Sequence, residues 1–217
     1  MNHVRGCFVL SSIVATAVLF GADVDIAARG PASVIPNDAS AIARITSLGD
    51  DGPIRLEGEW TNSILQVQQN VATGAVVRMF DGVTNKTLLV SALKIADGQS
   101  DLTIGESEGD GVVSALTPGS GLLLENASAG AVLTVNADVV NNTTATTLSK
   151  AGAGKVVLTG ANAYSGATLI DEGELAFGGN STQTLVGVIS GAGSLVKEGG
   201  RTLGSHGCEY LCRPHCD

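Results

Sequence analysis

Short runs of β-forming residues recur along most of the chain, and Gly, Asn, Asp or Ser separates nearly all of them. Several runs alternate, as in LTI at residues 102–104 and VLTVNADV at residues 132–139, so that one side chain points inward and the next outward. No segment shows a sustained helical period. This pattern predicts an all-β fold, either a sandwich, a barrel or a β-solenoid. The runs lie at residues 54–56, 64–67, 75–80, 87–93, 102–104, 121–124, 131–135, 156–159, 168–170, 174–177, 185–189 and 194–196.

The composition indicates a regular, ladder-rich β architecture. Of the 217 residues, 44% are hydrophobic but only 3% are aromatic, so Val, Leu, Ile and Ala must build the core. There are 29 glycines and 5 prolines, which favours many tight turns. Residues 8–207 contain no cysteine, so a domain of this sequence must be held by burial and backbone hydrogen bonds and not by disulfides. The formal net charge of -9 argues against a nucleic-acid partner.

A weak internal similarity favours the solenoid. KAGAGKV, which begins at Lys150, aligns with KEGGRTL, which begins at Lys197. An offset of 47 residues suits two coils of about 20 to 25 residues each.

The first residues have the pattern of a secretory signal peptide. Arg5 precedes an apolar run from Cys7 to Phe20, and small and acidic residues follow. We therefore expect a signal peptide within residues 1–28, cleaved between Gly21 and Ala28. The run is short for an uncleaved membrane anchor. Residues 29–53 are expected to form a capping or irregular segment with a brief helical turn at 39–45, because the exposed end of a stack needs covering.

The stretch SKAGAGKVVLTGANAYSGATLIDEGEL at residues 149–175 resembles the autotransporter-associated β-strand repeat of bacterial passenger regions. We assign one complete repeat to residues 148–179. A second unit begins with ISGAGSLVKEGG at residues 189–200 and then departs from the pattern. The resemblance implies a right-handed parallel β-helix, here over residues 54–200, in a secreted or cell-surface bacterial protein. The repeat motif comprises Lys150, Gly152, Gly154, Gly160, Asn162, Tyr164, Gly166 and Gly173.

The resemblance implies no activity, because function resides in a site and not in a fold. We expect a non-enzymatic, adhesin-like passenger fragment that needs no cofactor and contacts a host-cell or matrix surface, a glycan or other passenger repeats. The aromatic content is too low for the girdles of a membrane β-barrel, so membrane contact is expected only through secretion or a barrel that these residues lack.

A secreted carbohydrate-active β-helix, lyase-like or hydrolase-like, is the alternative. Paired carboxylates on one face could do acid and base work. Among Asp171, Glu172 and Glu174, only Glu172 and Glu174 have the spacing to share a strand face. We interpret this cluster as a solvated polar surface.

Three other patterns invite a binding-site interpretation. AGAGKV at residues 151–156 lacks both the first glycine and the final Ser or Thr of a phosphate loop, because Ser149 and Val156 stand there. Two acidic loops could gather oxygen ligands for calcium, although turn chemistry alone explains Asp beside Gly. Their candidate ligands are Asp50, Asp51, Glu106, Glu108 and Asp110.

The tail at residues 201–217 differs abruptly from the rest. Its potential zinc ligands are Cys208, Cys212, His215 and Cys216. We interpret the tail as the product of a frameshift or truncation, with a zinc-binding or disulfide-bonded tail as the alternative. Aromatic residues are expected in stacking or core positions; they include Trp60, Phe80, Tyr164 and Phe177.

Overall fold

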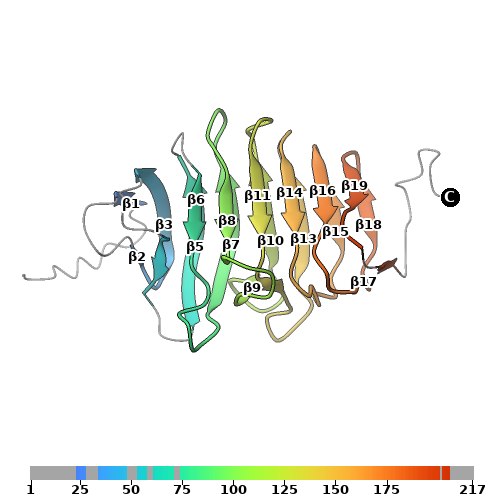
Figure 1. Ribbon diagram of the computed structural model, residues 1–217, viewed down its shortest axis with the longest axis horizontal. Helices are drawn as coiled ribbons and strands as arrows, with labels where there is room; N and C mark the ends of the chain where they lie inside the picture. The colour runs from blue at the N-terminus through green and yellow to red at the C-terminus, as the bar shows by residue number, and fades with distance from the viewer. Residues whose placement is uncertain are drawn as a thin grey trace, which may run out of the picture.

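The protein is a stack of parallel β-coils that runs from one end of the molecule to the other (Figure 1). The computed structural model describes residues 23–27, 34–47, 53–57, 61–70, 74–200 and 202–205. These residues form strands, turns and bends, so no helix in the described part of the chain could cross a membrane. Most of the predicted signal peptide, and the tail from residue 206 onward, lie outside the described residues.

The larger sheet forms one long side of the stack. Its strands follow chain order in steps of one coil, and every pair is parallel. Its main path comprises β1 (Asp23–Ala27), β3 (Asp38–Ser47), β5 (Thr61–Gln69), β7 (Thr87–Ile95), β10 (Gly121–Asn126), β13 (Thr147–Ala151), β15 (Thr168–Ile170) and β18 (Ile189–Gly191). Off this path, β9 (Val112–Ala115) pairs with β7 and with β12 (Asp138–Val139).

A six-stranded parallel sheet forms the second long side. It comprises β6 (Ala75–Val77), β8 (Leu102–Ile104), β11 (Val132–Val135), β14 (Lys155–Leu158), β16 (Glu174–Phe177) and β19 (Ser194–Lys197). Two short parallel pairs complete the coils at the ends: β2 (Val34–Ile35) with β4 (Arg55–Leu56), and β17 (Gln183–Leu185) with β20 (Leu203–Ser205). The predicted parallel β-solenoid is therefore confirmed.

Apolar side chains from both long sheets meet in one continuous core. In the six-stranded sheet, Leu133, Val156 and Leu175 occupy the same position on successive coils and are fully buried. Across the core, Leu93 and Leu124 stack in the same way in the larger sheet. Each coil thus covers the apolar edge of its neighbour, which explains why a sequence poor in aromatic residues has a core.

The alignment of Lys150 with Lys197 is wrong, although the coils in that region have the predicted length of about 20 residues. Lys155 pairs with Glu174 and Glu174 with Ser194, so these coils take about 20 residues, whereas Ala92 pairs with Leu123 a full 31 residues on. Lys150 lies in β13 of the larger sheet, but Lys197 lies in β19 of the other sheet. The two segments align because a lysine followed by glycines occurs at each of two different corners of the solenoid.

The segment expected to be capping or irregular contains an ordered strand. The helical turn predicted at residues 39–45 is wrong, because β3 runs through it and pairs with both β1 and β5. Alternate residues of β3 are buried, namely Ala41, Ala43 and Ile45. Residues 39–45 contain three alanines, which have a weak helix preference, but the pairing of neighbouring coils overrides it. β1 (Asp23–Ala27) lies at the C-terminal end of residues 1–28, the segment predicted to contain the signal peptide.

Other strand boundaries also differ from the prediction. The run at residues 185–189 is not one strand, since β17 ends and β18 begins within it, on different sides of the coil. β9 and β13 were not predicted. β12 is the end of the alternating run at residues 132–139, but it forms a separate two-residue strand that pairs with β9 in the larger sheet.

Candidate functional site

Lys150 of the repeat motif points into the protein, which a charged side chain rarely does. It takes the same inward position as Leu124 and Ile170 on the adjacent coils and is 0% exposed. Its Nζ donates hydrogen bonds to three backbone carbonyl oxygens, those of Ala151 at 2.9 Å, Gly152 at 2.5 Å and Glu172 at 2.9 Å. Lys150 therefore joins two coils from inside.

Burial lowers the pKa of Lys150, and the nearby charge of Glu172 opposes that shift. The three carbonyl oxygens compensate the cost of burying the ammonium group. The arrangement stabilises a corner of the coil, and the amine is not open to a ligand.

The motif glycines lie where one coil touches the next. A Cβ on Gly152 would lie 2.3 Å from the carbonyl oxygen of Asn126, and one on Gly166 would lie 2.2 Å from that of Thr146. The same holds for Gly154, Gly160 and Gly173, each of which would place a Cβ within 2.6 Å of an atom of the preceding coil. A positive φ also favours glycine, but of the five only Gly152 and Gly173 have one. Close stacking explains the others.

Asn162 connects three consecutive coils through its side-chain amide. Its Oδ1 accepts a hydrogen bond from the backbone N–H of Val139 at 3.0 Å, on the coil before. Its Nδ2 donates to Oε1 of Gln183 at 2.9 Å, on the coil after, and to the carbonyl oxygen of Gly160 at 3.0 Å. Since Asn162 is only 4% exposed, these bonds satisfy an amide that could not reach water.

Tyr164 is a core residue, as predicted. Its hydroxyl group shares a hydrogen bond of 2.9 Å with Oγ1 of Thr168, and both residues are buried. Burial raises the pKa of Tyr164 to about 12, although the bond to Thr168 acts the other way. Phe177 is fully buried too, but Phe80 is 37% exposed, so of the two predicted positions, stacking or core, the core one is wrong for Phe80. Trp60 lies outside the described residues.

Asn126 has the same role one coil before the repeat and was not predicted. Its fully buried Nδ2 donates to the carbonyl oxygens of Ala131 at 2.8 Å and Lys155 at 2.9 Å. Its Oδ1 accepts from the backbone N–H of Ser128 at 3.1 Å. The sequence signal that could have found it is Asn at the end of an alternating strand, just before a turn.

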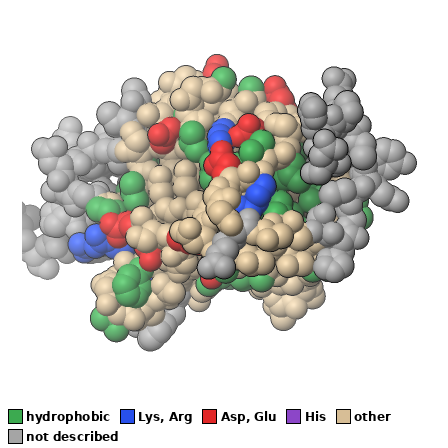
Figure 2. Space-filling model, turned by 45° about the vertical axis from the view of Figure 1, so that its right-hand side comes forward, with side chains coloured by type: hydrophobic (Ala, Val, Ile, Leu, Met, Phe, Trp, Pro, Cys, Tyr) green, Lys and Arg blue, Asp and Glu red, His purple; other side chains and the backbone are tan. Residues whose placement is uncertain are grey.

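The carboxylates considered for catalysis are not brought together over a cleft. Glu174 forms an ion pair of 2.9 Å with Lys155, which also contacts Glu198 one coil further on. These two carboxylates, Glu198 foremost, raise the pKa of Lys155. Glu172 lies in the exposed turn that precedes β16. Figure 2 likewise shows acidic and basic side chains lying side by side on the surface, between uncharged ones.

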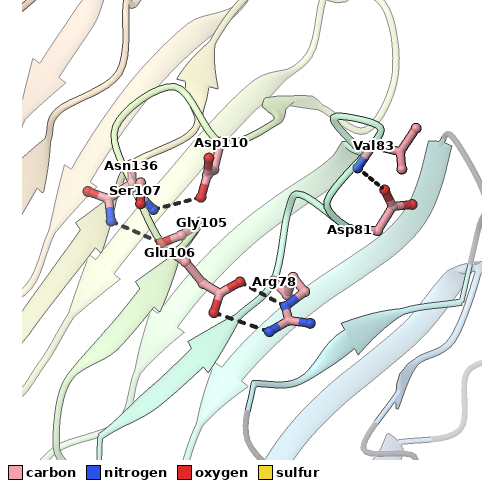
Figure 3. A network of polar contacts seen from close by, with 8 residues as sticks. All are labelled: Arg78, Asp81, Val83, Gly105, Glu106, Ser107, Asp110 and Asn136. Atoms are coloured by element: carbon pink, nitrogen blue, oxygen red, sulfur yellow. Dashed lines mark hydrogen bonds and ion pairs between the residues drawn. The ribbon is translucent and has the colours of Figure 1, made fainter.

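The acidic loop considered for calcium, residues 105–111, directs its three carboxylates to different partners. Figure 3 shows those of Glu106 and Asp110. Glu106 binds Arg78 at 2.7 Å, and Asp110 accepts from the backbone N–H of Ser107 at 2.7 Å. Glu108 accepts bonds of 2.8 to 3.2 Å from the backbone and side chains of Asn180 and Ser181.

These bonds, first that from the Asn180 backbone, lower the pKa of Glu108. The loop therefore fastens to a segment about 70 residues away. Within the described ranges no three His, Cys, Asp or Glu residues are placed to hold a metal ion. Asp50 and Asp51 lie outside the described residues, as do all four zinc candidates of the tail.

The structure reveals a pocket that the sequence did not suggest. It has a volume of about 260 Å³ and lies between β4 and the hairpin at residues 80–86. Its lining combines three cations with an acidic group and two apolar side chains. The sequence signal for this pocket was weak. Its three cations stand out in such an acidic chain, but they are not neighbours in the sequence and become a cluster only when the coils stack. The lining residues are Arg55, Leu56, Arg78, Phe80, Asp81 and Lys86.

Comparison with known proteins agrees with the geometry of the repeat. A family model described as the passenger-associated-transport-repeat matches residues 148–177. Neither the search of curated proteins nor the search of solved structures returned a match. The matched segment contains every motif residue described above, and such a repeat implies a secreted or cell-surface bacterial protein. Residues 148–177 are therefore a passenger-associated-transport-repeat, the repeat of autotransporter passenger regions.

Proposed function

We propose that this chain is a non-enzymatic structural segment of a bacterial surface passenger, with an adhesin-like role. One observation carries the proposal: the polar side chains of the repeat bind neighbouring coils and not a cleft. The hydrogen bonds of the Lys150 and Asn162 side chains described above all lie within the stack. A repeat whose polar groups are used in this way builds length and rigidity.

The surface of the stack supports a role in contact. A solenoid offers long strand faces and a series of loops, which suit extended binding to a host-cell or matrix surface, to a glycan or to other passenger repeats. In this proposal the predicted signal peptide directs the chain out of the cytoplasm, and the chain works at the outer membrane or beyond it.

The rival is a carbohydrate-active β-helix. Such an enzyme needs an acid and a base at a defined separation over a bound sugar. In the described residues, the best candidate for the pair has one member bound to Lys155 and the other in an exposed turn. This arrangement favours the scaffold.

Two assays on the purified full chain test the proposal. Fluorescently labelled protein is added to cultured host cells and to immobilised matrix proteins, and we expect saturable binding. The same protein is incubated with pectins and other polysaccharides, and we expect mass spectrometry to detect no new oligosaccharide. Failure of the folded protein to bind any of these surfaces, or release of oligosaccharides, would overturn the proposal.

A further inference from the structure

The pocket at Arg55 is built from two adjacent coils. Ile54 forms a parallel bridge with Val77, so the residues that follow, Arg55 and Arg78, are neighbours on successive coils. The backbone N–H of Arg78 donates to the carbonyl oxygen of Ile54 at 2.7 Å, which fixes the two strands together. Two guanidinium groups thus line one side of the pocket.

A tight hairpin carries three other lining residues, Phe80, Asp81 and Lys86. Phe80 and Asn85 form a backbone bridge, and Oδ1 of Asp81 accepts from the backbone N–H groups of Val83 at 3.0 Å and Thr84 at 2.8 Å. The bond from Thr84 first, then the one from Lys86 and then that from Val83, lower the pKa of Asp81 to about 2. The hairpin that carries Phe80 and Lys86 is therefore fixed before any ligand arrives, which reduces the entropic cost of binding.

The charges of the pocket leave one cation unmatched. Lys86 pairs with Asp81 at 3.0 Å, and Arg78 binds Glu106 through Nε at 2.7 Å and through Nη2 at 3.4 Å. Figure 3 shows the remaining terminal nitrogen of Arg78 pointing away from Glu106. Arg55 is exposed and has no ion pair with any residue that the structure describes. Arg55, Arg78 and Lys86 carry three positive charges, and Asp81 in the lining and Glu106 outside it carry two negative charges. The pocket and its ion pairs therefore have one positive charge in excess, which matches a ligand with a single negative charge.

Apolar groups accompany this charge. Phe80 is 37% exposed in a protein that otherwise buries most of its large apolar side chains, and Leu56 lies beside it at 8% exposure. An aromatic side chain and two arginines in one pocket suit a flat or cyclic molecule that carries an acid group. A volume of about 260 Å³ is close to the lower limit for small-molecule sites, so the pocket suits one sugar unit.

We propose that this pocket binds a sugar carboxylate, that is, one uronic acid unit of an acidic glycan. The carboxylate lies between Arg55 and the free edge of the Arg78 guanidinium, and the sugar ring lies against Phe80. A phosphate monoester, which carries about 1.5 to 2 negative charges at pH 7, fits less well, because Asp81 and Glu106 limit the positive excess to one charge. The biological use of this site rests on the proposed surface role, but binding by the purified chain does not.

Isothermal titration of the purified full chain tests the proposal with four ligands. Galacturonate is the probe, galactose lacks the charge, galactose 6-phosphate carries a larger one, and acetate lacks the ring. We expect galacturonate to bind with a Kd of about 1 mM, as for a sugar-sized ligand of ordinary efficiency, and the other three to bind at least about tenfold more weakly.

Variants assign the binding to this pocket. Arg55→Gln should raise the Kd for galacturonate about tenfold, because a hydrogen-bonded charge is lost, and Phe80→Ala should raise it about fivefold. Lys94→Gln is the matched control. Lys86 of the pocket directly precedes β7, whereas Lys94 lies near the end of that strand, so its loss should leave the Kd unchanged. Circular dichroism establishes that each variant is folded.

Several results would overturn the proposal. One is the absence of binding heat at a galacturonate concentration about ten times the expected Kd. The others are equal binding of galactose or acetate, tighter binding of galactose 6-phosphate, and an unchanged Kd for galacturonate in folded Arg55→Gln. None of these results depends on the cell-binding assay, so each of the two proposals can be refuted without the other.

Discussion

Replacing Gly166 with alanine should destabilise the solenoid strongly, because a methyl group there has no space. The new Cβ would lie 2.2 Å from the carbonyl oxygen of Thr146, whereas ordinary contact begins at 3.4 Å. The coil cannot move away, because Gly187 of the following coil already lies against the carbonyl oxygen of Gly166. Backbone atoms block the methyl group on a rigid corner, so we expect a loss of about 3 kcal/mol in the free energy of unfolding, the upper end for overpacking.

Gly130→Ala provides the matched control. Gly130 has no positive φ, and nothing lies within 4 Å of the point that a Cβ on it would occupy. Alanine there should be neutral or stabilise the protein by up to about 1 kcal/mol, since it restricts the unfolded chain. Thermal unfolding followed by circular dichroism compares the two variants. For a protein of this size, a loss of about 3 kcal/mol lowers Tm by about 6 to 12 °C. Equal Tm values for the two variants would refute direct stacking at this corner.

Three further predictions concern the same stack. Leu158→Asp places a charge at a fully buried position and should unfold the repeat. Leu169→Asp, at a 39% exposed position, should change the free energy of unfolding by less than about 0.5 kcal/mol. An unchanged melting temperature of Leu158→Asp would show that Leu158 does not point inward. Asn162→Ala should cost about 2 to 4 kcal/mol in urea unfolding, because Val139 N–H and Gln183 Oε1 lose their partner; a double-mutant cycle with Gln183→Ala that shows no coupling would contradict the bond. Tyr164 keeps its proton up to about pH 12 when folded but loses it near pH 10.0 when unfolded, so its stabilising effect is complete below pH 10 and is lost as pH rises to 12. The free energy of unfolding should fall by about 1.4 kcal/mol per pH unit in that window, more steeply than in Tyr164→Phe; parallel pH profiles would show that the hydroxyl is not buried.

Alternation and turn residues were enough to predict the β-rich stack and most of its apolar strands. β8, β15 and β16 were predicted with their observed bounds, because each follows a plain alternation or an apolar run between turn residues. The repeat segment was recognisable because its glycines and Asn162 must recur where coils touch.

Features that depend on the stacking of coils could not be predicted. Lys150 looks like a surface residue, and only the register of β13 between β10 and β15 shows that it points inward. Glu108 binds Asn180 and Ser181 because the stacking of coils brings the two loops together, a contact that no local pattern encodes. The pocket likewise needs Arg55 and Arg78 to lie on adjacent coils, which follows from coil length and not from residue type.

The most direct test of the coil stack is a set of distances along one column of side chains. Val76, Thr103, Thr134, Val157, Ala176 and Val196 occupy equivalent positions on successive strands of the six-stranded sheet.

Spin labels at residues 103 and 196, or at 76 and 196, can be introduced after the four native cysteines are replaced by serine. Pulsed electron paramagnetic resonance then measures each separation. Strands about 4.8 Å apart predict Cα separations of about 19 Å and about 24 Å, an increase of one strand spacing. Equal separations, or a shorter distance from residue 76, would contradict the parallel solenoid.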